Sequence, residues 1–177
     1  MTATLSETRY VTALFKDREH AERAYRSAIE LGYNKDDINL MMSDDTRKLH
    51  FPSVQAADTE LGNKAAEGAG VGGAIGGTIG AIAAAIAAMG TSLVIPGLGL
   101  IVAGPLAAAV AGAGAGGITG GLVGALVGWG IPEERVKHYE TGIREGGILL
   151  SIKTRSDQDA QYFEQQWRAN GGEHVYA

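Results

Sequence analysis

The feature that most constrains this chain is a run of 65 residues, 68–132, in which no side chain carries a charge. The rest of the chain holds all 15 Lys and Arg and all 20 Asp and Glu residues, whereas the run holds 20 of the 27 glycines. An uncharged stretch of this length must be covered by lipid, by a partner or by other copies of the chain. The sequence therefore poses a question of assembly or membrane insertion before one of catalysis.

Composition excludes several classes of function. A net charge of −5 provides no basic surface of the kind that binds nucleic acid. The absence of cysteine excludes disulfides and thiolate metal ligands, and it fits a reducing compartment. The first 16 residues lack the basic and then apolar order of a secretion signal, so we expect the first 60 residues to be cytosolic.

The N-terminal part of the chain predicts a β-α-β unit. Residues 9–15 are rich in β-forming side chains and predict a strand. Asp17 stands where a helix N-cap would, apolar side chains then recur at helical spacing, and Gly32 is a natural helix stop. Residues 38–42 predict the second strand.

The C-terminal part repeats this pattern after one extra helix. Pro132 opens that helix and a glycine pair at 146–147 ends it. A strand is expected over residues 148–152, then a helix capped by Asp157, and a short strand over residues 174–176.

Together the two halves predict an α+β fold, a split ferredoxin-like sandwich of four antiparallel strands with two helices on one face. Residues 1–43 and 131–177 would form this domain, and neither half has enough strands to be stable alone. Residues 44–67 are polar and predict a linker with a short helix near residues 54–61. Residues 68–130 would be a long apolar helical hairpin, inserted between the second and third strands.

The insertion divides into two segments, 68–89 and 105–129, joined by Pro- and Gly-rich residues 90–104 that predict a turn. About 21 helical residues span roughly 30 Å, enough to cross a bilayer. Glycine recurs every four residues in each segment, which on a helix makes a groove for close backbone approach. These helix-packing and oligomerisation positions are Gly68, Gly72, Gly76, Gly80, Gly112, Gly116, Gly120, Gly124 and Gly128. Trp129 ends the second segment and would anchor it at a membrane interface.

Two other interpretations of the glycines are weaker. A flexible linker would not need strict four-residue spacing with interleaved isoleucines. Two G-x-G-x-x-G matches, at 68–73 and 112–117, follow no clear strand and have no acidic residue about 20 positions later, so they do not predict a phosphate loop. Because each interior glycine costs about 1 kcal/mol in a helix, tight packing or a bilayer must offset that cost.

No motif supports catalysis. The four histidines are scattered, none has the i, i+4 spacing of a helical metal site, and the serines lack a nucleophile context. We therefore expect no enzyme activity, no metal and no cofactor.

The chain resembles the bacterial general stress protein family, which includes heat- and low-temperature-induced members. The opening half carries this resemblance in Val11-Thr12-Ala13-Leu14-Phe15, Ala21-Glu22-Arg23-Ala24 and Leu31-Gly32-Tyr33. The closing half carries it in Ile131-Pro132-Glu133-Glu134, Tyr139-Glu140, Gly142-Ile143 and Gly146-Gly147-Ile148-Leu149, which are similar to members with a glycine-rich middle. The resemblance implies a stress-associated protein and supplies no catalytic residues.

The leading hypothesis is a non-enzymatic structural protein that self-assembles through its glycine-zipper hairpin in or at the cell membrane. The α+β domain would then lie on the cytoplasmic side, and the partners would be other copies and membrane lipid, with no nucleic acid. A first alternative is a soluble homo-oligomeric particle or filament in the cytoplasm, which buries the hairpins against each other. A second alternative is a membrane-anchored ligand sensor.

Overall fold

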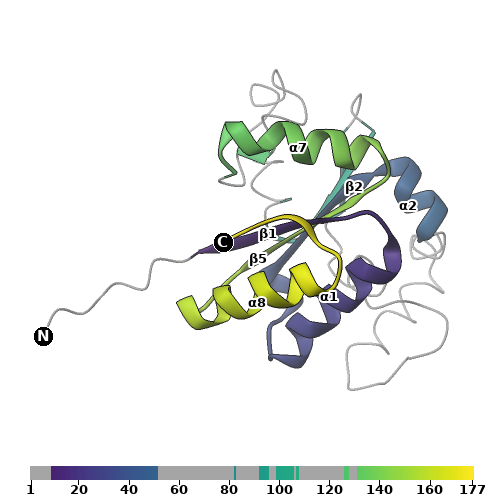
Figure 1. The fold of residues 1–177 in the computed structure, drawn as a ribbon. Coiled ribbons are helices and arrows are strands. Elements are labelled where there is room, and N and C mark those ends of the chain that lie inside the picture. The colour runs from purple at the N-terminus through teal and green to yellow at the C-terminus, as the bar shows by residue number, and fades with distance from the viewer. Residues whose placement is uncertain are drawn as a thin grey trace, which may run out of the picture.

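The computed structural model describes residues 9–51, 82, 92–95, 99–105, 107, 126–127 and 131–177. They form an α+β domain around one antiparallel sheet (Figure 1). The strands are β1 (Tyr10–Phe15), β2 (Ile38–Ser43), β3 (Ser92–Ile95), β4 (Leu100–Ala103), β5 (Ile148–Lys153) and β6 (Glu173–Tyr176). The helices are α1 (Arg18–Glu30), α2 (Asp44–His50), α7 (Glu133–Arg144) and α8 (Asp157–Ala169), with a 3-10 turn at Lys35–Asp37.

The strand order in the sheet is β3-β4-β2-β5-β1-β6, and every neighbouring pair is antiparallel. In the interior of the sheet, β1 from the N-terminal part of the chain lies beside β5 from the C-terminal part over six paired positions. The predicted α+β class is confirmed, and the strands predicted at both ends of the chain lie within one or two residues of their expected bounds.

Strand alternation divides the apolar side chains between two cores. On β1, Val11, Ala13 and Phe15 face the core that α1 and α8 cover, whereas Leu14 faces the core that α7 covers. Figure 1 shows α1 and α8 together on one side of the sheet and α7 on the other. Helix α7 was predicted as a helix, but its position on the opposite face of the sheet was not.

Local capping explains where the helices begin and end. Asp17 caps α1 by accepting the N–H of His20 at 2.9 Å, as predicted. At α8 the prediction is displaced by one residue, because Ser156 is the N-cap and Asp157 lies in the first turn. Gly32 takes a left-handed φ of +81° just after α1, which glycine adopts without steric cost.

The middle of the insertion corrects the prediction most strongly. Residues 90–104 were expected to be a turn joining two long helices, but β3 and β4 form a β-hairpin that joins the sheet beside β2. The N–H of Asp44 donates to the carbonyl of Gly99 at 2.7 Å and ties the turn of this hairpin to the domain. Gly104 ends β4 with a φ of +111°, and a Cβ there would lie 2.6 Å from the carbonyl oxygen of Ile38. Only glycine therefore allows β4 to leave the sheet so close to β2.

Other described residues of the insertion also pack on the domain. Ile82 is buried in the core beneath α1 and α8, and Ala107 and Leu126 are buried in the core beneath α7. Within the described ranges no long apolar helical hairpin is seen, so that part of the prediction is not supported. None of the helices described is long and apolar enough to cross a bilayer.

The predicted linker, residues 44–67, is also corrected at its start. Residues 44–50 form α2, whose N-cap is Ser43 and whose first turn holds Asp44 and Asp45. The polar composition of these residues predicted a linker, but it also suits a short helix, because acids in the first turn and bases in the last turn interact favourably with the helix dipole. The short helix expected near residues 54–61 lies outside the described residues.

Candidate functional site

The residues predicted to mediate helix packing all lie outside the described part of the chain. This holds for Gly68, Gly72, Gly76, Gly80, Gly112, Gly116, Gly120, Gly124 and Gly128, and for the predicted interface anchor Trp129. Their roles stay predictions. What the structure does place is the seam through which the insertion meets the domain, which consists of Ile82, β4, Ala107 and Leu126.

Strand β4 carries most of this seam. It pairs with β2 from Leu40↔Ala103 to Ser43↔Leu100 without a register break. Its side chains alternate between the two cores, since Ile101 lies in the core of α1 and α8, and Val102 lies in the core of α7. All four residues of β4 are buried. The centre of the insertion is thus an interior strand of the domain and not a detachable appendage.

A buried carboxylate forms a second point of the seam. Glu22 on α1 is only 7% exposed, and its Oε2 accepts the N–H of Ile82 at 3.2 Å. Its Oε1 lies 3.7 Å from Nε of Arg18 and has no hydrogen-bond partner among the described residues. Arg18 in turn donates to the carbonyl of His50 at 2.7 Å. A charge buried this deeply is costly unless it is paired, so Glu22 ties α1 to the insertion and to the end of α2.

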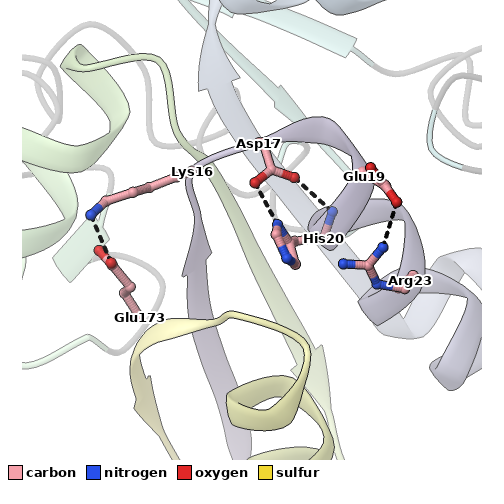
Figure 2. A network of polar contacts seen from close by, with 6 residues as sticks. All are labelled: Lys16, Asp17, Glu19, His20, Arg23 and Glu173. Atoms are coloured by element: carbon pink, nitrogen blue, oxygen red, sulfur yellow. Dashed lines mark hydrogen bonds and ion pairs between the residues drawn. The ribbon is translucent and has the colours of Figure 1, made fainter.

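The exposed side of α1 beside Glu22 borders a hollow of about 450 Å³. Cations and acids alternate along it, and Arg23 donates to Glu19 at 2.8 Å one helical turn away (Figure 2). The residues that line it are Arg18, Glu19, Glu22, Arg23 and Arg26. Because the charges largely neutralise each other, the hollow does not select an anion or a cation.

A second hollow, of about 330 Å³, opens where α7, β1 and β6 meet. Figure 2 shows Lys16 reaching across to Glu173, and the two atoms of this ion pair are 2.7 Å apart. The hydrogen bond to Glu173 raises the pKa of Lys16 above its ordinary value. The rings of His138 and His174 stack with centroids 4.6 Å apart. This histidine pair could not be predicted from the sequence, because the two residues lie on different elements and are far apart in the chain.

Tyr139 connects α7 to β6 beneath this second hollow. Its hydroxyl donates to the carbonyl of His174 at 2.6 Å and accepts from the hydroxyl of Thr12 at 2.8 Å. Burial raises the pKa of Tyr139 to about 12. His174 has a left-handed φ of +49°, which costs energy in a non-glycine residue and is held by these contacts.

Among the described residues no three His, Asp or Glu side chains are placed to hold a metal ion. Asp17 and His20 bond to each other (Figure 2). Partial burial tends to raise the pKa of Asp17. Hydrogen bonds from the N–H and the ring of His20 outweigh this effect and hold the pKa of Asp17 below its usual range. This pair caps α1, and its role is structural.

Comparison with known proteins adds no relative to these observations: no family model matches the chain, and neither a curated protein nor a solved structure matches it.

Proposed function

We propose that this protein is a non-enzymatic structural protein that associates with other copies of itself through its apolar insertion. One observation carries the proposal: the centre of the insertion is a strand pair built into the sheet, and the outermost described strand, β3, bears no charge. The domain thus holds an apolar segment in a fixed position, as a packing element requires. The family resemblance adds that the role is stress-associated.

The domain that presents the insertion is, in this proposal, a split ferredoxin-like sandwich. The support is the order β2-β5-β1-β6 with antiparallel neighbours and with α1 and α8 on one face. Strands β3 and β4 extend this sheet beyond β2. In the sequence they lie between β2 and β5, which are the second and third strands of the motif. Helix α7 covers the face that a minimal sandwich leaves open.

Contact between copies is favoured over a bilayer as the cover for the insertion. Ile82 lies near the middle of the predicted segment 68–89, and a spanning helix would place it deep in the hydrocarbon. Its backbone instead donates to Glu22 on α1. The β3–β4 hairpin, between the two segments, is likewise held on β2. Assembly without lipid keeps these contacts, whereas two membrane spans would break them.

Attachment to a membrane is the second candidate, because glycine rows every four residues over an uncharged run are typical of packed membrane helices. In that case the α+β domain would lie at the cytoplasmic face of the cell membrane. The two candidates differ in whether detergent or lipid is needed to keep the full chain in a defined assembly.

Sedimentation velocity of the full chain without detergent, combined with flotation on anionic and neutral vesicles, tests the proposal. We expect concentration-dependent oligomers without lipid and no flotation. Flotation of most of the protein with either vesicle would support the membrane candidate instead. A monomer at all concentrations that does not float would refute both candidates.

Glycine variants test the packing rows. We expect Gly76→Leu and Gly120→Leu, on the rows, to abolish the oligomer because leucine fills the groove that a second backbone must approach. Gly70→Leu and Gly114→Leu are matched controls, since they lie two residues from row positions and so on another side of a helix. Equal effects at row and control positions would contradict the zipper.

A further inference from the structure

The two edges of the sheet differ in a way that identifies a contact surface. At one edge lies β6, and at the other lies β3. A strand at a sheet edge presents unpaired N–H and C=O groups that can bind a strand of another chain. Proteins usually protect such edges with charges, bulges or irregular backbone, so the degree of protection shows which edge is free to pair.

The β6 edge is protected. Glu173 carries a charge and is held by Lys16 at 2.7 Å. His174 has a φ of +49°, and the register with β1 shifts between Thr12 and Leu14. These features bend the outer edge of β6 and place polar groups on it, so it is a poor template for a second strand.

The β3 edge lacks those protections. Its sequence, Ser92-Leu93-Val94-Ile95, contains no charge and no proline, and it pairs with β4 in unbroken register. Leucine, valine and isoleucine suit a strand in a sheet. The hairpin is also held firmly, since β4 is buried on both faces and the N–H of Asp44 binds the carbonyl of Gly99. The strand is therefore fixed in place with its outer backbone groups unpaired by any described strand.

We propose that β3 pairs with β3 of a second copy of this chain, antiparallel across a two-fold axis, so that the two six-stranded sheets become continuous. This inference rests on the proposed function and identifies its contact surface. An antiparallel pair of four-residue strands makes about four backbone hydrogen bonds. Two-fold symmetry closes the pair, so the contact produces a dimer and not an open filament.

Charge explains why the partner is a second copy at this edge and not elsewhere on the surface. Each chain carries a net charge of −5, so two copies repel over most of their surfaces. Strand β3 lies within residues 68–132, which carry no charge, so it meets its counterpart without that repulsion. On α2, which contacts β4, Asp44 is already paired with Arg47 and Lys48. The short pairing then acts together with contacts from the rest of the insertion, because linked contacts reinforce each other.

Lysine at the edge tests the pairing in the full chain. Val94→Lys places like charges close to the proposed axis, and we expect the dissociation constant of the dimer to rise by at least about tenfold. Leu49→Lys is the matched control, since it adds the same charge at a leucine on α2 that is 75% exposed. The control should stay within about twofold of wild type, a difference of roughly 0.4 kcal/mol.

Cross-linking gives a second measurement that does not depend on weakening the fold. The chain has no cysteine, so Val94→Cys or Leu93→Cys introduces the single thiol of each variant. Antiparallel pairing brings a residue near the axis within disulfide reach of its own copy, where the Cα atoms are about 5.5 Å apart. Under mild oxidation we expect at least one of these variants to form a linked dimer much faster than Leu49→Cys does.

The outcomes separate this inference from the function on which it rests. If the wild-type chain stays a monomer, both are wrong. If it assembles but Val94→Lys assembles equally well and neither edge cysteine cross-links faster than the control, the edge pairing is wrong and self-association stands. Far-UV circular dichroism of each variant checks that the domain is folded. If Val94→Lys proves to be unfolded, the cross-linking of the cysteine variants decides whether the edges pair.

Discussion

Truncation of Ile101 tests whether the insertion is part of the folded domain. Ile101 lies on β4, opposite Met42 of β2, and is only 2% exposed in the core that α1 and α8 cover. The change Ile101→Ala removes three carbon groups, which at about 0.8 kcal/mol each amounts to roughly 2.4 kcal/mol of lost burial. The cavity left behind adds to this loss, so we expect a decrease of about 3 kcal/mol in the free energy of unfolding.

The assay is urea unfolding followed by far-UV circular dichroism and by tryptophan fluorescence, since Trp167 is buried in the same core. A loss of about 3 kcal/mol corresponds to a drop of roughly 6–12 °C in Tm for a chain of this size. Ile29→Ala on α1 is the matched control, because it removes the same atoms from a side chain that is 43% exposed. We expect the control to cost less than about 1 kcal/mol.

A detachable insertion would give a different result. If residues 92–103 were only an appendage, Ile101→Ala would leave the unfolding of the α+β domain within about 0.5 kcal/mol of wild type, as surface changes usually do. That outcome would refute the assignment of β4 to the cooperative unit. It would also remove the basis for placing β3 at a fixed sheet edge.

Two further predictions concern buried tyrosines. Tyr139→Phe leaves the hydroxyl of Thr12 and the carbonyl of His174 without their partner. We expect it to lower the free energy of unfolding by about 1–3 kcal/mol. A double-mutant cycle with Thr12→Val measures the coupling between the two side chains, and additive effects would contradict the hydrogen bond. Burial also raises the pKa of Tyr25 and of Tyr139 to about 12. The unfolded chain loses these protons near pH 10, before the folded chain does, so stability that is fully present below pH 10 should fall between pH 10 and 12, by about 2–3 kcal/mol for each tyrosine. Ultraviolet titration checks this, and ionisation of all six tyrosines near pH 10 with the fold intact would contradict it.

The elements at both ends of the chain could be predicted because their local signals agree with their tertiary surroundings. At α1, the cap at Asp17, the helical spacing of Ala21 and Ala24, and the left-handed Gly32 all indicate the same helix. Where capping, apolar pattern and termination agree in this way, the secondary structure of a segment can be predicted without knowledge of its tertiary contacts. Helix α7 follows the same rule, since Pro132 precedes it and acids fill its first turn.

The β3–β4 hairpin could not be predicted with the rule applied to the insertion. The glycine rows on both sides favoured two helices, and the Pro- and Gly-rich residues 90–104 between them were therefore predicted as the turn that joins them. A signal was nevertheless present: two β-branched runs, 92–95 and 100–103, flank the turn residues Pro96 to Gly99. Considering the residues between the glycine rows on their own would have identified the hairpin.

Two contacts near the candidate sites could not be predicted, for a different reason. The seam between Glu22 and Ile82, and the stack of His138 on His174, each join residues that only the folded chain brings together. Nothing in the sequence marks Glu22 as buried, because an acid on a polar helix is ordinarily solvated. Contacts between residues this far apart in the chain depend on the tertiary fold, so a local sequence pattern does not predict them.

Burial along β2 explains why the split domain needs its insertion. Residues Ile38 to Met42 are all buried, on both faces, as in an interior strand and not an edge strand. In a four-stranded sandwich β2 would be the edge, and its unpaired backbone N–H and C=O groups would be open to pairing with other chains. Strand β4 covers that edge and makes β2 interior. The exposed edge is thereby transferred to β3, which lies within the charge-free run. The segment that completes the sheet therefore also carries the edge through which we propose that copies pair.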